Sequence, residues 1–284
     1  MSIIGDNVNL LSPLLVRFIM LKYSRLVCMK LMLVFGACIL VQSFGTHAAA
    51  EVSYSKFRFV FDDNARKDAL IISNRGLISV NCAASLEHFI MGDTGPSKLA
   101  TSSAEVSNSA EKLLRYAPRQ ANIAPNGSQV IRVSSRRRPG IAAGEYLSYL
   151  KLSCQEIEPK QQKNQAQINM VPRFISYFPL QVRVGDISAS THFENARIIE
   201  VKGKYKIVVE QYRQGERSIV GDIQVKDQAE TVLGAVNNVV IYPPFTKREH
   251  SISLTQAPKG KLEIVFTEDK SSLGSLVSGI SVKP

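Results

Sequence analysis

The chain has 284 residues, of which 45% are hydrophobic, and a formal net charge of +11. This length accommodates two domains of about 100 residues each and a targeting segment. The apolar fraction is that of a folded protein, which argues against disorder. The excess of basic residues alone is compatible with nucleic acid, an anionic surface or an acidic partner.

The N-terminal region has the pattern of a secretory signal peptide. Lys30 is followed by an apolar run, Leu31–Phe44, and then by small residues up to Ala50. We expect cleavage after Ala50. A membrane anchor is the alternative, but the run is shorter than the roughly 20 apolar residues that span a bilayer, so no stable membrane insertion is expected after cleavage. Residues 1–28 are interpreted as an upstream extension, because a normal signal peptide would begin at Met29.

Export narrows the choice of partners. Without residues 1–50 the chain keeps 31 basic and 23 acidic residues, a net charge of +8. An exported protein is not expected to bind nucleic acid. The concentrated basic run, Arg136–Arg138, is interpreted as a solvated cluster in a loop between strands.

Two cysteines, Cys82 and Cys154, remain after cleavage. Their even number and the oxidising compartment favour a disulfide over two free thiols. Each lies in a predicted strand, so the bridge would join two strands of one domain.

Helical periodicity is almost absent, and short strands alternate with turns, which predicts an all-β sandwich architecture. Residues 92–122 contain few strand formers and are expected to form a loop or short helix, and Gly185-Asp186 is the expected hinge. The strands predicted before the hinge are Phe57–Phe61, Ala69–Ser73, Ile78–Ala84, Val130–Val133, Tyr146–Cys154 and Ile168–Val184. Those predicted after it are Ala196–Glu200, Tyr205–Tyr212, Gly221–Lys226, Val239–Tyr242, Ser251–Leu254 and Lys261–Phe266.

Four motifs occur in a fixed order along this pattern. A turn and strand, A-P-N-G-S-Q-V-I-R-V, begins at Ala124, and G-E-Y-L-S-Y-L begins at Gly144. The first predicted strand contains an R-x-x-F motif at Arg58 and is followed by L-x-x-x-N at Leu70, and G-E-R-S-I-V-G-D-I-Q-V begins at Gly215. Together they resemble a divergent branch of the PapD-like periplasmic chaperones of pilus and fimbrial assembly, over residues 51 to about 255.

The resemblance implies two immunoglobulin-like β-sandwich domains at an angle, at residues 51–184 and 187–284. It also implies that the chaperone lends an edge strand to an incomplete pilin subunit. Here the donor strand would be Gln167–Phe174, in which Ile168, Met170 and Phe174 share one side-chain parity and would face the client. An ordinary core strand is the alternative interpretation of this segment.

Chaperones of this family also hold the terminal carboxylate of the subunit between two basic residues. The first maps onto Arg58, whose planar guanidinium suits a carboxylate. The second is expected at Arg183, with Arg173 as the other candidate. A plain solvent-facing arginine is the alternative for Arg58.

The resemblance therefore predicts a periplasmic chaperone that stabilises fimbrial subunits by donor-strand complementation and delivers them to an outer-membrane usher. The alternative is an exported immunoglobulin-like adhesin or carbohydrate-binding module, although the chain has no Trp. No enzymatic activity, cofactor or metal is expected. The sequence lacks nucleotide-binding, hydrolase and metalloprotease motifs, and its histidines have no metal-ligand spacing. Those histidines are His47, His88, His192 and His250.

Overall fold

The computed structural model describes residues 51–92, 95–136, 139–157 and 172–283. These residues belong to one compact unit. The predicted signal peptide lies outside the described residues, as do Ile168 and Met170 of the predicted donor strand.

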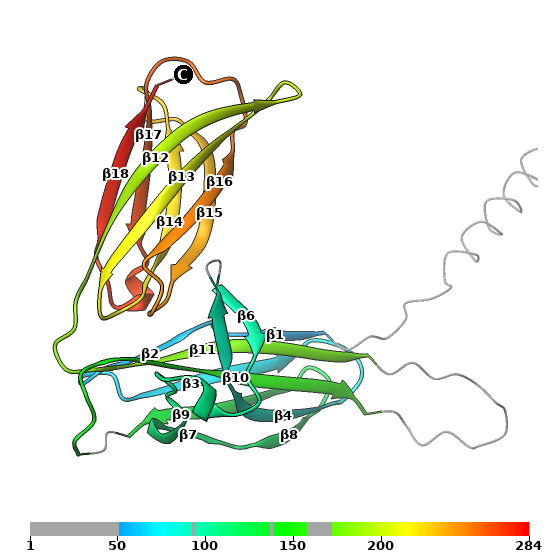
Figure 1. The fold of residues 1–284 in the computed structure, drawn as a ribbon. Coiled ribbons are helices and arrows are strands. Elements are labelled where there is room, and N and C mark those ends of the chain that lie inside the picture. Colours follow the sequence, from blue (N-terminus) through cyan, green and yellow to red (C-terminus); the bar gives the residue numbers. More distant parts are fainter. Residues whose placement is uncertain (1–50, 93–94, 137–138, 158–171, 284) are drawn as a thin grey trace, which may run out of the picture. The chain divides into compact units, whose positions relative to one another are not determined.

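The described residues form strands, turns and short 3-10 helices, and no α-helix occurs among them. In this part of the chain, no helix is long and apolar enough to span a membrane. The strands fall into two immunoglobulin-like β-sandwiches, which confirms the predicted all-β class (Figure 1).

The first sandwich contains β1 to β11, coloured blue to green in Figure 1. One sheet has the strand order β1-β3-β9-β7, and the other has the order β2-β11-β10-β4-β8. A hairpin of β5 and β6 forms a small sheet of its own. The strands are β1 Val52–Tyr54, β2 Phe59–Phe61, β3 Lys67–Asn74, β4 Val80–Glu87, β5 Phe89–Gly92, β6 Gly95–Leu99, β7 Leu114–Ala117, β8 Gln120–Ile123, β9 Ser128–Ser135, β10 Gly144–Glu156 and β11 Arg173–Val184.

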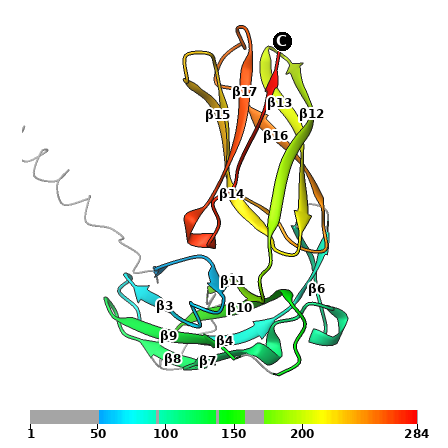
Figure 2. The ribbon, with the colours of Figure 1, turned by 90° about the vertical axis from the view of Figure 1, so that its left-hand side faces the viewer.

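The second sandwich contains β12 to β18, and Figure 2 shows its two layers from a second direction. Its sheets have the orders β12-β13-β16 and β15-β14-β17-β18. The strands are β12 Ala189–Val201, β13 Lys204–Gly215, β14 Ile219–Lys226, β15 Val232–Ile241, β16 Lys247–Ser253, β17 Leu262–Glu268 and β18 Val277–Val282.

Each sandwich core is built from strand residues that alternate between the two faces of a sheet. In β3, Leu70 and Ile72 are fully buried, whereas Ile71 between them is 43% exposed. Strand β10 is apolar on both faces. Leu150 and Leu152 enter the first core, and Leu147 and Tyr149 join a separate cluster with Val220, Val240 and Tyr242 of the second sandwich.

A disulfide joins Cys82 of β4 to Cys154 of β10, as predicted. The two cysteines are direct cross-strand partners in an antiparallel pair. Both are buried in the core of the first sandwich, so the bridge links two adjacent strands of one sheet.

The predicted turn before β9 is confirmed. Asn126 has a φ of 56°, and the backbone N–H of Gly127 donates to the carbonyl of Ala124 at 2.9 Å. The turn is held from β3, because the side-chain amide of Asn74 donates to the carbonyls of Ile123 and Ala124. Asn74 of the L-x-x-x-N motif is therefore buried and ties this turn to the end of β3.

The prediction of a loop or short helix over residues 92–122 was only partly right. The region contains two 3-10 helices, η1 (Ser103–Glu105) and η2 (Glu111–Leu113), but also β6, β7 and β8. The sequence of β8, Q-A-N-I, has weak strand propensity, and it is a strand because it pairs with β4. Its conformation is set by its neighbour in the sheet, which local patterning does not reveal.

Candidate functional site

Strand β11 has an open edge along its first half. Strand β10 pairs with β11 from Arg173 to Val184, but β2 pairs only with Leu180–Val182 on the other side. Residues 173–179 therefore have a strand partner on one side only within the described part of the chain. An unpaired strand edge is a template to which another chain can add a strand.

Apolar side chains are exposed along this edge. Phe174, Ile175 and Tyr177 are 37%, 49% and 39% exposed. Phe174 has the same parity as Phe178 and Leu180, which are buried in the first core. Phe174 thus lies on the core-facing side of β11 but is not covered by the core of this sandwich. Phe174 is the one predicted donor residue that the structure describes.

Arg58 directly precedes β2 and lines a pocket of about 360 Å³. Its Nη2 donates to Oδ1 of Asn238 in β15 at 3.1 Å. Its Nε is buried and has no hydrogen-bond partner among the described residues. Phe59 and Phe61 point into the core as predicted, whereas Phe57 is 71% exposed because it lies outside the strand.

Three tyrosines, Tyr149, Tyr177 and Tyr242, line the same pocket as Arg58. Burial raises the pKa of Tyr149, and the adjacent Tyr242 adds to this shift. Burial likewise raises the pKa of Tyr242, opposed by the positive charge of Arg58. Both hydroxyls therefore stay neutral and can donate a hydrogen bond. The Tyr149 hydroxyl is buried beside that of Tyr242.

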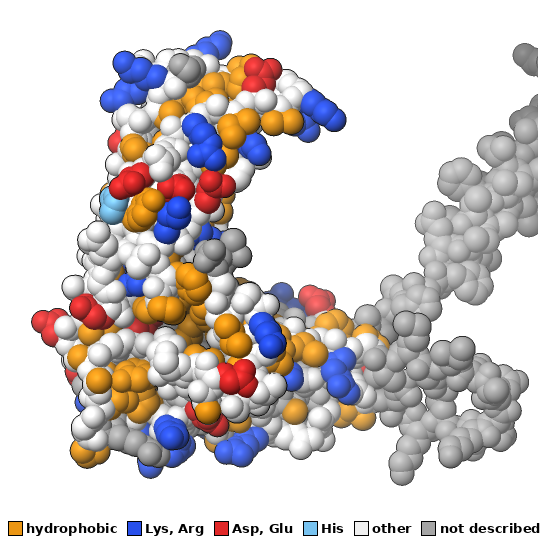
Figure 3. Space-filling view, viewed as in Figure 1, with side chains coloured by type: hydrophobic (Ala, Val, Ile, Leu, Met, Phe, Trp, Pro, Cys, Tyr) orange, Lys and Arg blue, Asp and Glu red, His pale blue; other side chains and the backbone are white. Residues whose placement is uncertain are grey.

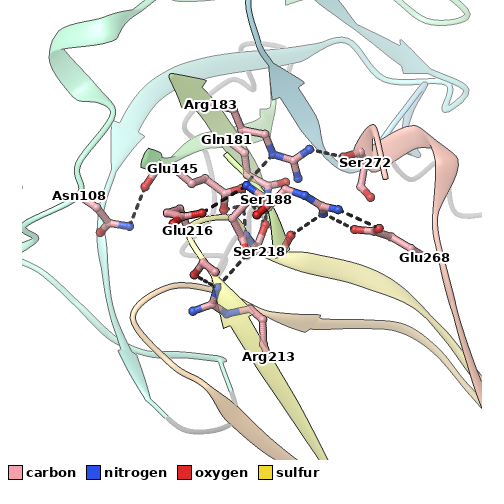
Figure 4. A network of polar contacts seen from close by, with 12 residues as sticks. Asn108, Glu145, Gln181, Arg183, Ser188, Arg213, Glu216, Ser218, Glu268 and Ser272 are labelled. Atoms are coloured by element: carbon pink, nitrogen blue, oxygen red, sulfur yellow. Dashed lines mark hydrogen bonds and ion pairs between the residues drawn. The ribbon is translucent and has the colours of Figure 1, made fainter. Parts of the chain in front are cut away.

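A buried polar network, shown in Figure 4, joins the two sandwiches around Glu145 of β10. One carboxylate oxygen of Glu145 accepts hydrogen bonds from Nε of Arg183 at 3.1 Å and from the backbone N–H and hydroxyl of Ser218 at 3.2 and 3.0 Å. The other oxygen accepts from the Gln181 side chain at 3.3 Å. Nη1 of Arg183 donates to the carbonyl of Ser272 at 2.6 Å. Residues of both sandwiches thus share one desolvated carboxylate.

The three predicted anchor arginines do not lie together. Arg183 is 6% exposed and is bonded to Glu145 and Ser272, so it is part of the network between the sandwiches. Arg173 is exposed and donates to Gln155 at 3.0 Å. It lies seven residues before Leu180, the partner of Phe59, which is about 23 Å along an extended strand. Of these three arginines, only Arg58 lines the pocket.

Two of the sequence motifs meet in this network. Glu145 belongs to G-E-Y-L-S-Y-L and Ser218 to G-E-R-S-I-V-G-D-I-Q-V. The sequence prediction assigned no role to either residue. The available signal was an acidic residue at the start of an otherwise apolar strand, because a buried carboxylate requires partners.

The structure places two of the histidines inside the sandwiches. His88 and His250 are buried and hydrogen-bonded, the first to hydroxyls of Ser109 and Ser148 and the second to Gln211. Nowhere in the described ranges do three or more His, Cys, Asp or Glu residues group so that they could hold a metal ion. On the face shown in Figure 3, Lys and Arg side chains are spread over both sandwiches with acidic side chains between them.

Comparison with known proteins yields a likeness of fold. No family model matches the chain, and no curated protein matches it. Several of the similar solved structures are chaperones. The Pseudomonas aeruginosa CupB2 chaperone is 15% identical, with a TM-score of 0.45, over 81% of this chain and 99% of CupB2. The YadV chaperone is 9% identical, with a TM-score of 0.47, over 81% and 99% of the two chains. The Salmonella enterica SafB chaperone, solved with the SafA pilin, shows 11% identity and a TM-score of 0.43 over 82% and 97%.

Proposed function

We propose that this chain is a periplasmic chaperone that holds an incomplete β-sandwich subunit of a surface fibre by lending it the edge of β11. The open edge at residues 173–179 is the observation that carries the proposal. A client sheet that lacks a strand has unpaired backbone groups and an uncovered apolar groove. Both can be satisfied by a strand edge with apolar side chains on its core-facing row.

Phe174 supplies the described part of that apolar row, and Met170 and Ile168 would extend it toward the N-terminus. The client's terminal carboxylate would bind at Arg58, beside the pocket's neutral tyrosine hydroxyls. The chaperone would then release the subunit to an outer-membrane usher. The buried disulfide and the N-terminal signal pattern fit export to an oxidising compartment.

The proposal is tested by co-expressing the chain with fimbrial subunits encoded beside it and measuring their co-purification. The double substitution Met170→Ser and Phe174→Ser should abolish capture, because each buried apolar anchor contributes roughly 1.5 to 3 kcal/mol. Val232→Ser is the matched control, since Val232 is 45% exposed in the second sandwich. Normal thermal unfolding of each variant would show that the fold is kept. Undiminished capture by the folded double variant would show that β11 does not donate the strand.

A further inference from the structure

The pocket that Arg58 lines contains a second cation, Arg248 of β16 in the second sandwich. Arg248 is half-buried, and its Nη1 donates to the carbonyl of Val240 at 2.9 Å. Burial lowers the pKa of Arg248. Its guanidinium nevertheless stays charged in proteins. Two arginines from different sandwiches therefore line one small cavity.

The pocket contains a buried hydrogen-bond donor that has no acceptor among the described residues. Nε of Arg58 is buried without a hydrogen-bond partner among the described residues, and the hydroxyl of Tyr149 is buried beside that of Tyr242. An unsatisfied buried donor costs free energy, and a bound oxygen atom would remove that cost. Nothing in the local sequence pattern of β16 relates Arg248 to Arg58.

The charged residues that line the pocket favour binding of an anion. Among the described residues that line it, none is acidic. A neighbouring pocket of about 560 Å³ also contains Arg58 together with Lys56, but it is lined by three acidic residues as well, Asp68, Asp222 and Asp269. A carboxylate is therefore favoured more in the smaller pocket, which has two arginines and no acidic residue, than in the larger one. The aromatic rings of Phe89, Tyr149 and Tyr177 add an apolar wall.

We propose that Arg248 is the second basic residue that binds the client's terminal carboxylate, in place of Arg183. This inference rests on the proposed function. The carboxylate would lie between Arg58 of the first sandwich and Arg248 of the second, and the client's last side chain would pack on the aromatic wall. Binding would thus use both sandwiches, and not the first alone.

The test uses a fluorescein-labelled peptide of alternating threonine and valine that ends in phenylalanine, made with a free carboxylate and as the C-terminal amide. Fluorescence anisotropy measures its affinity for the full chain. Amidation should weaken binding roughly 30-fold or more, the range for losing one partner of a buried charge pair. Arg58→Ala and Arg248→Gln should each cause a similar loss for the free acid. The glutamine keeps an N–H donor for Val240.

In both variants the penalty for amidation should become small, because the two changes remove halves of one interaction. Arg248→Lys should restore part of the affinity. Arg197→Gln is the control, because Arg197 is an exposed residue of the same sandwich. If Arg248→Gln binds both peptides as the unchanged chain does while Arg58→Ala loses affinity, the role of Arg248 is refuted and the chaperone proposal stands. If the unchanged chain does not prefer the free acid, the carboxylate site itself is refuted.

Discussion

Individual buried polar residues hold turns and strands of this protein together through hydrogen bonds. Asn74 holds the turn before β9, and Glu145 collects donors from both sandwiches. Each of these side chains is buried and hydrogen-bonded, so removing one leaves its partners unsatisfied. Because an unsatisfied buried group costs free energy, substituting such a residue should lower stability more than removing an exposed ion pair.

His250 should make the free energy of unfolding depend on pH. It is 4% exposed, and its ring nitrogen Nε2 is 2.9 Å from Oε1 of Gln211. Burial, together with the nearby charge of Arg248, lowers the pKa of His250 to about 4. The folded state thus binds this proton more weakly than the unfolded state, whose pKa is about 6.5. Stability from His250 is fully present above pH 6.5 and is lost as the pH falls toward 4.

Urea unfolding between pH 7 and pH 4 checks this prediction. His250 should account for a loss of up to about 3 kcal/mol across that range. His250→Gln should flatten this slope, while the lowered pKa of buried His88 leaves a remainder of the same sign. His192→Gln, at an exposed position, serves as the control. An unchanged slope in the His250 variant would contradict the assignment.

Among the strands, β10 contributes to several parts of the structure. It pairs with β4 and β11, contributes to two apolar clusters and supplies Cys154 and Glu145. The partner of β10, β11, is buried where β2 covers it and exposed before that point. One strand pair therefore provides both the rigid base of the site and its open edge.

The Cys82–Cys154 bridge should stabilise the first sandwich. It closes a loop with a sequence separation of 72 residues. By chain entropy alone such a loop contributes about 4 kcal/mol, and measured losses of native disulfides are typically 2 to 5 kcal/mol. The double variant Cys82→Ala and Cys154→Ala should lower the stability of the first sandwich by this order in calorimetry. Reductant should destabilise the unchanged chain but leave the double variant unaffected, and alkylation of both thiols without reductant would show that no bridge forms.

At the scale of the whole molecule, the network around Glu145 should make the two sandwiches unfold together. Glu145→Ala leaves Arg183 buried without its carboxylate, which typically costs about 3 to 5 kcal/mol. We expect the single calorimetric transition to separate into two. Replacing the pair with Glu145→Leu and Arg183→Met should be less destabilising than Glu145→Ala, because no buried charge is then left alone.

Glu249→Gln is the matched control for this experiment. It removes an ion pair with Arg197 in which both side chains are about half exposed, and such pairs contribute about 0 to 1 kcal/mol. Equal effects of the Glu145 and Glu249 substitutions would mean that the buried network does not couple the sandwiches.

The sequence by itself determined the all-β class, the turn at Asn126-Gly127 and the pairing of Cys82 with Cys154. These depend on local turn chemistry, on the two-residue period of strands and on a count of two cysteines. Arg58 was singled out by the resemblance of its strand to that of the PapD-like chaperones, and its parity is opposite to that of Phe59 and Phe61. Each inference uses residues that are close in the chain or few enough to leave one choice.

Only the tertiary structure shows where each arginine lies and what it contacts. Arg183 follows the apolar residues of β11 and resembled an anchor, but Glu145 and Ser272 enclose it. Arg248 has no local signal, yet it lines the same pocket as Arg58. The physical reason is that burial and charge pairing depend on which strands of the two sandwiches lie side by side. Those contacts join residues that are far apart in the chain, and local sequence periodicity does not predict them.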